Sequence, residues 1–345
     1  MVTVISALVV FGILVLVHEL GHFVMAKRTG MFVKEFAIGF GPKLISRKIG
    51  ETVYSIRCIP LGGFNDIAGM DPGDDEAGER SYFRKPIAHR MVVIVAGAAM
   101  NLILPIFLFW GMIYFNGVAS PSPEPVLGEV VANTPAAKAG LKDGDRIVKM
   151  DDKVINSWQD FTDVVRDGAG HSYRVVLERD GKQQETVLTP EYDEQAKRAM
   201  VGVRSDVIIE KAGIGEAFSM ALSRNMLIIR RMLEGIGDII FGEAAGEVSG
   251  PIGVIQMTGE MAEAGMLPLI NFAALLSLNL GIVNLLPIPA LDGGHFVMLL
   301  LEAVRGKPLG EKALGNVQMI GIACLLTIML FATKNDIVRI FFKKP

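Results

Sequence analysis

The sequence is poor in cysteine and in excess positive charge. Cys58 lies in a charged segment and Cys324 in an apolar run, and these two are the only cysteines among 345 residues, so no disulfide framework is expected. Lys and Arg number 34 against 37 Asp and Glu, which gives a net charge of -3. Because proteins that bind nucleic acid present a basic surface, we expect no nucleic-acid partner.

Charged residues are also scarce, at 21%, whereas 51% of residues are hydrophobic and the mean hydropathy is +0.42. These values indicate a membrane protein with a soluble insert. Four apolar segments predict membrane spans, at residues 1–26, 91–116, 266–303 and 316–333. No Lys or Arg precedes the first run and no small-residue cleavage motif follows it, which predicts a retained helix and not a signal peptide.

The connecting segments predict the topology. Residues 27–90 hold eleven Lys and Arg against eight Asp and Glu, and the short segment 304–316 is also basic. Since positive loops stay in the cytoplasm, both segments are expected there. Within 27–90, a turn at residues 49–51 separates two strand-like stretches, and the pair Gly62 and Gly63 marks a break, which predicts a β-hairpin region.

Residues 120–208 have shorter apolar runs and regular turn signals, and they predict a compact α+β module. Ser157 is a candidate N-cap for a helix through Val165, and Asp180-Gly181 predicts a hairpin of strands 173–179 and 182–188. Residues 213–264 form an amphipathic helical region, expected on the membrane surface or against the module and not as a fifth span. Its first helix carries a polar stripe of Glu216, Ser223, Arg230, Glu234 and Asp238.

The stretch "HELGH" at residues 18–22 matches the H-E-x-x-H pattern of zinc proteases. On a helix, His18 and His22 share one face and can bind one zinc ion. Glu19 lies close enough to accept a proton from a metal-bound water. Ionisable groups are costly inside a membrane helix, so their presence favours a function over a chance match.

A second stretch, "NLLPIPALDGGH" at residues 284–295, interrupts the third apolar segment. Pro287 and Pro289 cannot continue a helix, and a non-helical backbone at membrane depth is tolerated only in a protein interior or beside water. Asp292 falls in this stretch and needs a cation as partner. Zinc is the natural candidate, which makes Asp292 the expected third ligand, with His295 as the alternative.

The pair HELGH and NLLPIPALDGG resembles the site-2 protease family of intramembrane zinc metalloproteases, in its regulator-of-sigma-E protease branch. The likeness extends over nearly the whole chain. It implies a polytopic α-helical membrane protein with four transmembrane helices, a cytoplasmic membrane-associated β-hairpin region and an inserted α+β PDZ domain. The stretches "NTPAAKAGLKDGDRI" and "VGVR" resemble a bacterial PDZ domain, with a groove expected between helix 158–167 and the strand near 201–204.

The resemblance also implies the site. Zinc is expected at His18, His22 and Asp292, and Glu19 is expected to act as the base. The residues expected to bind substrate are Asn284, Pro287, Gly62, Gly63 and Phe64. Two departures stand out: the chain has room for one PDZ domain where many relatives have two, and Asn65-Asp66-Ile67 replaces an apolar and basic continuation after Phe64.

The function that these features favour is an intramembrane endopeptidase that cleaves transmembrane segments of single-span proteins. Anti-sigma factors and remnant signal peptides are the substrate classes expected, with a peptide or a substrate ectodomain at the PDZ domain and lipid around the spans. The expected location is the bacterial cytoplasmic (inner) membrane, with the PDZ domain extracytoplasmic and the active site near the cytoplasmic side. The alternatives are a zinc-dependent transporter or receptor with a PDZ sensor, and a PDZ scaffold without chemistry; Glu19 favours the hydrolase.

Overall fold

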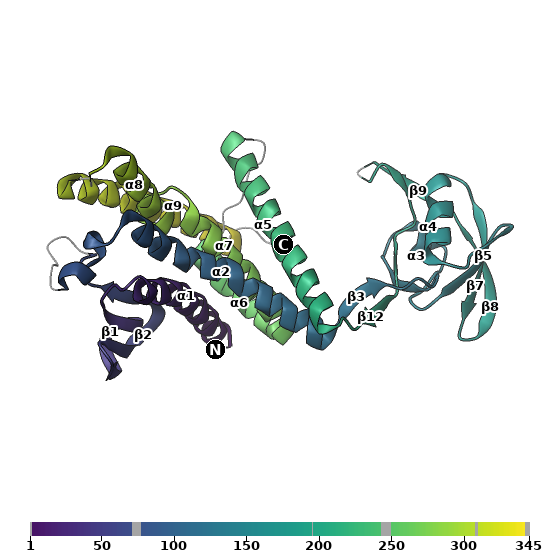
Figure 1. The fold of residues 1–345 in the computed structure, drawn as a ribbon. Helices are drawn as coiled ribbons and strands as arrows, with labels where there is room; N and C mark the ends of the chain where they lie inside the picture. Colours follow the sequence, from purple (N-terminus) through teal and green to yellow (C-terminus); the bar gives the residue numbers. More distant parts are fainter. Residues whose placement is uncertain (1, 71–76, 195, 243–249, 308–309, 342–345) are drawn as a thin grey trace. The chain divides into compact units, whose positions relative to one another are not determined.

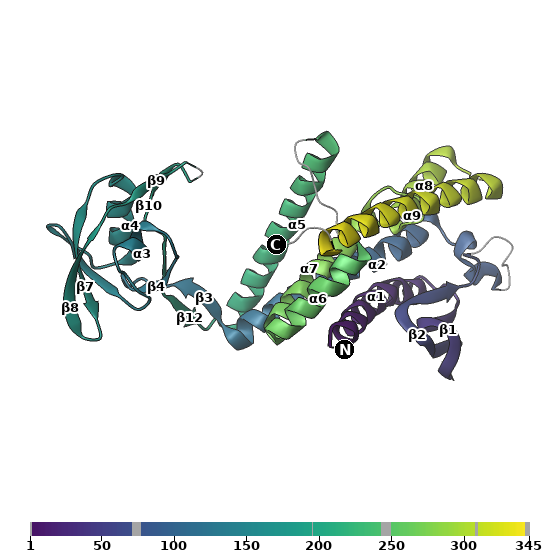
Figure 2. The ribbon, with the colours of Figure 1, turned by 180° about the vertical axis from the view of Figure 1, so that it is seen from behind.

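The computed structural model describes residues 2–70, 77–194, 196–242, 250–307 and 310–341. The chain forms two compact units, one of residues Met1–Met112 with Ile214–Pro345 and one of Ile113–Gly213. The first unit, which we call the membrane unit, is built from helices and one sheet; the second, the inserted domain, holds the remaining strands (Figure 1). Two opposite views show α1 (Val2–Arg28), α2 (Ile87–Asn116), α6 (Pro251–Ala264) and α7 (Met266–Leu285) of the membrane unit side by side (Figure 2).

Four helices of the membrane unit are long and apolar enough to cross a membrane: α1, α2, α7 and the segment Lys312–Arg339 of α9. At about 1.5 Å per residue, each reaches the thickness of a hydrocarbon core of about 30 Å. The described residues therefore contain four helices that can span a membrane, the number that the sequence predicts. The helices of this unit are α1 (Val2–Arg28), α2 (Ile87–Asn116), α5 (Ile214–Phe241), α6 (Pro251–Ala264), α7 (Met266–Leu285), α8 (Asp292–Arg305) and α9 (Glu311–Phe341).

The third predicted span is two helices and not one. α7 ends at Leu285, and α8 begins at Asp292. Pro287 and Pro289 lack the N–H that a continuing helix needs, and Ala290 adopts a φ of 73°. The sequence placed Asp292 inside the opened stretch, whereas the structure places it at the first position of α8.

Both helices of the amphipathic region contact the spans. The polar stripe of α5 is exposed as predicted, and residues on the opposite face contact the spans. Asn225 is fully buried and donates to the Leu102 carbonyl of α2 at 3.1 Å, and Arg224 donates to Asn271 of α7 at 2.8 Å. α6 packs into the bundle as well, since Gly253 donates its backbone N–H to buried Asp336 of α9 at 2.8 Å. Sequence periodicity shows that a face is apolar but not what covers it.

Strands β1 (Val33–Ile49) and β2 (Thr52–Ile67) form a sheet more elaborate than a hairpin. Residues 43–49 pair with 52–57 around the predicted turn at Gly50. The register also pairs residues 35–38 in the same direction with 53–56 and in the opposite direction with 63–66. Each strand therefore contributes two segments, which bend at glycines with positive φ, at 87° for Gly39 and 107° for Gly62. The pair Gly62 and Gly63 bends β2 and does not end it.

Glu35 holds these segments together. Its carboxylate accepts from Ser55 at 2.5 Å and from Arg57 at 2.8 Å, and it pairs with Lys43 at 2.7 Å. Burial opposes the ionisation of Glu35, but these hydrogen bonds outweigh it and lower its pKa to about 2. The sheet is thus locked by an ionised group at neutral pH.

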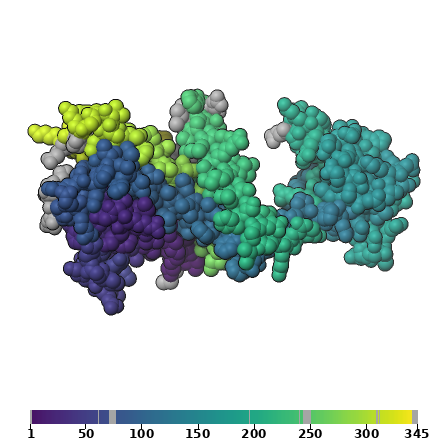
Figure 3. Space-filling view, in the orientation of Figure 1, coloured from purple at the N-terminus to yellow at the C-terminus, as the bar shows by residue number. Residues whose placement is uncertain are grey.

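A hydrophobic core fixes the sheet, α1, α2 and α8 relative to one another. The buried side chains that form it are Ala26, Met31, Val33, Ile67, Tyr82, Val93, Ile94 and Leu299. Short 3₁₀ helices, η1 (Gly78–Arg80) and η2 (Tyr82–Arg84), lead from the sheet to α2. Beside them, buried Arg90 of α2 forms a bidentate pair with Glu302 of α8 at 2.5 and 3.1 Å. Figure 3 shows the sheet as a lobe beside the purple surface of α1.

The inserted domain has the α+β architecture that the sequence predicts. Ser157 and Asp160 form a capping box at the start of α4, and the hairpin at Asp180-Gly181 joins β7 to β8. Phe161 and Val165 of α4 pack into its core. Its elements are β3 (Val118–Pro121), β4 (Leu127–Val130), α3 (Pro135–Lys138), β5 (Arg146–Met150), β6 (Lys153–Val154), α4 (Trp158–Asp167), β7 (Tyr173–Arg179), β8 (Lys182–Leu188), β9 (Glu191–Asp193), β10 (Arg198–Met200), β11 (Val203–Ser205) and β12 (Val207–Glu210).

Candidate metal centre

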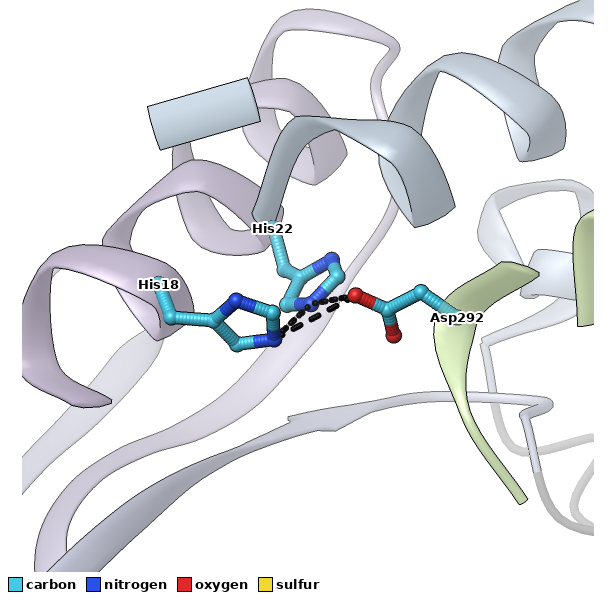
Figure 4. Close-up of side chains that lie close together, drawn as sticks. All are labelled: His18, His22 and Asp292. Carbon is cyan, nitrogen blue, oxygen red and sulfur yellow. Dashed lines mark hydrogen bonds and ion pairs between the residues drawn. The ribbon is translucent and has the colours of Figure 1, made fainter. Parts of the chain in front are cut away.

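Three side chains from two helices converge in the membrane unit (Figure 4). His18 and His22 lie one turn apart on α1, and Asp292 faces them from the start of α8. The two Nε2 atoms are 3.2 Å apart, and Asp292 Oδ2 lies 3.3 Å from Nε2 of His18 and 3.6 Å from Nε2 of His22. Among the described residues this is the one cluster of three His, Cys, Asp or Glu side chains close enough to hold a metal ion.

The donor atoms fit a zinc ion. A tetrahedral ion with bonds of roughly 2.0–2.1 Å keeps its donors about 3.3–3.4 Å apart, close to the separations found here. Asp292 Oδ2 is buried and has no hydrogen-bond partner among the described residues. A buried carboxylate oxygen without a partner is costly, so the arrangement calls for a cation. Two imidazoles and a carboxylate are a common donor set for catalytic zinc.

α2 orients His22. The Nδ1–H of His22 donates to the Val93 carbonyl at 2.8 Å, which leaves Nε2 with the lone pair that a metal needs. Gly97, one turn further along α2, makes room for the ring, because a Cβ at this position would overlap the imidazole. The other histidine, His18, is also buried, with an exposed fraction of 9%.

α2 also supports His18 through Asn101, which is fully buried. The Asn101 side-chain amide lies 3.4 Å from His18 Nδ1. When His18 binds a metal through Nε2, its Nδ1 carries a proton and must donate it. Asn101 Oδ1 otherwise has no partner among the described residues, and a turn of the amide places it to accept this proton. The α2 backbone is held nearby, since Ser277 of α7 donates to the Asn101 carbonyl at 2.8 Å.

Gly97→Ala is expected to weaken zinc binding by at least about 10-fold, the loss typical when the support of a metal ligand is removed. The added methyl group would displace the His22 ring from its place beside Val93. Gly111→Ala is the matched control on the same helix, since a Cβ there meets open space. Metal analysis of both purified variants decides the matter. Equal zinc content in Gly97→Ala and wild type would show that the His22 ring does not depend on this gap.

Glu19 follows His18 on α1 and is held by β2. Asn65 Nδ2 donates to Glu19 Oε2 and to the Glu19 main-chain carbonyl, both at 2.7 Å. Gly63 lies beside Glu19, since a Cβ on it would be in ordinary contact with Glu19 Cγ at 3.5 Å; the close approach that requires glycine here is to the Ala37 carbonyl oxygen of β1, at 2.7 Å. The carboxylate therefore lies between the helix that carries the histidines and the sheet.

The predicted substrate-binding residues fall at two places. Gly62, Gly63 and Phe64 lie on β2, and Gly63 is the one that adjoins Glu19. Phe64 stacks on Phe40 with ring centroids 6.2 Å apart. Asn284 is half-buried in the last turn of α7, and Pro287 is exposed in the α7–α8 connection.

Sequence reasoning missed the parts that α2 and β2 contribute to this centre. The Val93 carbonyl and Gly97 carry no signal in the sequence, because any residue supplies a carbonyl and glycine is common in membrane helices. Asn101 gave a signal as a polar residue within a span. Asn65 gave one as a departure from the pattern expected after Phe64.

The chain is similar to known proteins over most of its length. A model of peptidase family M50 matches residues 6–328. The chain is 33% identical to the regulator of sigma-W protease RasP of Bacillus subtilis, over 98% of this chain and 99% of that protein. It is 34% identical to the zinc metalloprotease RasP of Bacillus licheniformis, with the same coverage. A Clostridium acetobutylicum relative is 38% identical over 97% of each chain.

Among solved structures, the chain is similar to the PDZ domain of an SdrC-like protein from Listeria monocytogenes. The identity is 20%, the match covers 25% of this chain and 90% of that one, and the TM-score is 0.21.

The family match spans most of the chain, including both segments that carry the candidate metal ligands. The relatives align from end to end and not only over the spans. This chain belongs to peptidase family M50, the site-2 protease family of intramembrane zinc metalloproteases.

Proposed function

We propose that His18, His22 and Asp292 hold the zinc ion and that Glu19 is the base for hydrolysis of peptide bonds within the membrane. The observation that carries this proposal is the convergence of three donor atoms within 3.2–3.6 Å, with the Asp292 oxygen buried and otherwise unpaired. Bound zinc supplies a Lewis acid that polarises the scissile carbonyl and lowers the pKa of water. Glu19 accepts the proton of the attacking water and delivers it to the leaving amine.

The substrates proposed are transmembrane segments of single-span membrane proteins. A helical segment buries its peptide bonds in its own hydrogen bonds, so it must unwind before it can be cut. Residues 63–66 of β2 pair with β1 on one side, and no strand of the described chain pairs with them on the other. An unwound segment can add to this edge as a further strand. Gly62, Gly63 and Phe64 would then lie along the substrate, and Asn284 and Pro287 would contact it from the α7–α8 side.

The named relatives suggest which single-span proteins to test first. One relative is a regulator of sigma-W protease, so anti-sigma factors are the first candidates, followed by remnant signal peptides. The test is co-expression of each candidate with wild type and with Glu19→Gln. We expect a shortened fragment with wild type alone. The same fragment in both strains, or in neither for every candidate, would contradict the proposal.

We also propose the orientation of this multi-pass inner-membrane protein. Lys27 and Arg28 end α1, and Arg305 ends α8, so basic residues follow both halves of the metal centre. Such residues stay in the cytoplasm, which favours a site near the cytoplasmic side and an extracytoplasmic inserted domain.

The inserted domain is proposed to filter substrates by a PDZ-type groove. A pocket lies between α4 and residues 198–203, where the sequence predicted it, and Trp158, Phe161 and Val165 form its apolar wall. An extended peptide or a substrate ectodomain is the occupant proposed. A bulky ectodomain held there would stay away from the spans until an earlier cut has shortened it.

Deleting this domain should allow full-length substrates to be cleaved without a prior cut. Val118 of β3 lies opposite Glu210 of β12, so a short Gly-Ser linker can close the chain after removal of the residues between them. Immunoblots of a substrate with its whole ectodomain would show the fragment in the deletion variant, and Glu19→Gln in the deletion background is the control. Unchanged selectivity would mean that the domain is a spacer.

A further inference from the structure

We propose that Asn65 is a positioning residue, which holds the Glu19 carboxylate in the place where it acts as base. This inference rests on the proposed function, in which Glu19 is that base. Asn65 Nδ2 carries two N–H groups, and the structure directs it to two oxygens of Glu19, Oε2 and the main-chain carbonyl, each at 2.7 Å. Because both partners are acceptors, the amide orientation follows from the contacts themselves.

The two bonds fix the glutamate relative to its own helix. The main-chain carbonyl of Glu19 is part of α1, so the two hydrogen bonds from Asn65 set the position of the carboxylate relative to this helix. A glutamate side chain has several rotatable bonds, and an unrestrained one spends much of its time in unproductive rotamers. Holding it in one rotamer is the kind of pre-organisation on which proximity effects in catalysis depend.

Asn65 is not explained by folding alone. Its Oδ1 is buried and has no hydrogen-bond partner among the described residues. A buried acceptor without a donor costs stability, so an apolar residue would serve the sheet better at this position. The N–H groups of the same amide meet the Glu19 carboxylate beside the candidate metal centre, and these contacts offset part of the cost.

The position also connects substrate capture to catalysis. Residues 63 and 65 point to the same face of β2, because side chains alternate along a strand, and that face lies against α1. The main-chain groups of the same segment form the open edge proposed to pair with substrate. A substrate strand that orders this edge would therefore order Asn65, and through it Glu19.

The test is steady-state kinetics on purified Asn65→Ala and Asn65→Asp, with bound zinc measured in parallel. Loss of a hydrogen bond to a charged group corresponds to a fall of about 10- to 100-fold in kcat. We expect this fall in Asn65→Ala with KM and zinc content unchanged. Asn65→Asp removes the donors, adds a carboxylate opposite Glu19, and should fall at least as far.

Asn225→Ala is the matched control, since it removes another amide that donates to a helix carbonyl, at Leu102 on α2. Its kcat should match wild type. Wild-type kcat in Asn65→Ala, a raised KM with unchanged kcat, or an equal fall in Asn225→Ala would each overturn the inference. Glu19→Gln, measured in the same assay, distinguishes a failure of the proposed base from a failure of the role of Asn65. If Glu19→Gln retains turnover, Glu19 is not the base. If Glu19→Gln is inactive but Asn65→Ala is fully active, Glu19 remains the base and Asn65 does not position it.

Discussion

Asp292→Ala is expected to lose most of its bound zinc and all of its proteolytic activity while it remains folded in the membrane. Asp292 supplies the one carboxylate of the three donors, and the other two are imidazoles, which bind a metal without adding negative charge. Loss of an outer partner of a zinc ligand already costs about 10- to 100-fold in affinity, and loss of a ligand should cost more. The first position of α8 also favours a negative charge at this end of the helix.

Metal analysis of the purified variant measures this effect directly. Asp336→Asn is a suitable control, because Asp336 is a buried carboxylate on α9 that accepts from the Gly253 backbone and lies outside the cluster of metal-binding side chains. Asp336→Asn should keep a full equivalent of zinc even if it is less stable. A full equivalent in Asp292→Ala would place the third ligand elsewhere, and His295, three residues further along α8, would be examined first.

Glu19→Gln is expected to abolish cleavage and to leave the zinc in place. The substitution keeps the size of the side chain and an oxygen that can accept from Asn65, but an amide cannot take a proton from water at neutral pH. General acid–base catalysis is worth at least about 10²-fold, so turnover should fall by that factor or more. Single-turnover assays with equal amounts of zinc-loaded protein give the comparison. Turnover near that of wild type would rule out Glu19 as the base.

These two variants together separate binding of the metal from its use. Asp292→Ala should lose both zinc and activity, whereas Glu19→Gln should lose activity alone. A transporter or receptor would keep its zinc-dependent function in Glu19→Gln. The side-chain hydrogen bond that Glu19 accepts in the described structure comes from Asn65 and not from a member of the metal cluster. An unchanged zinc-dependent function in Glu19→Gln would favour that reading.

Features set by local chemistry could be predicted from the sequence. The capping box at Ser157 and the turn at Asp180-Gly181 depend on residues a few positions apart, and both are found where the sequence placed them. The spans depend on runs of apolar residues, which the sequence displays directly. His18 and His22 could be placed on one face because helix geometry fixes their spacing.

Features set by distant contacts could not be predicted. The same-direction pairing of residues 35–38 with 53–56 needs a bend at Gly39 that no local pattern specifies. The contact of Gly97 with His22 joins positions 75 residues apart, and that of Asn65 with Glu19 joins positions 46 apart. The contacts of α5 and α6 with the spans could not be predicted either, because an amphipathic face has the same sequence pattern whether it meets lipid or protein.

The proposed zinc site should cut a peptide bond inside a transmembrane segment. The direct measurement uses purified wild-type protein and a purified single-span substrate in detergent micelles, with the new termini identified by mass spectrometry. We expect one dominant cut within the apolar span, absent when a chelator has removed the zinc and restored when zinc is returned. A cut confined to the soluble part of the substrate, or a cut that persists without zinc, would contradict it.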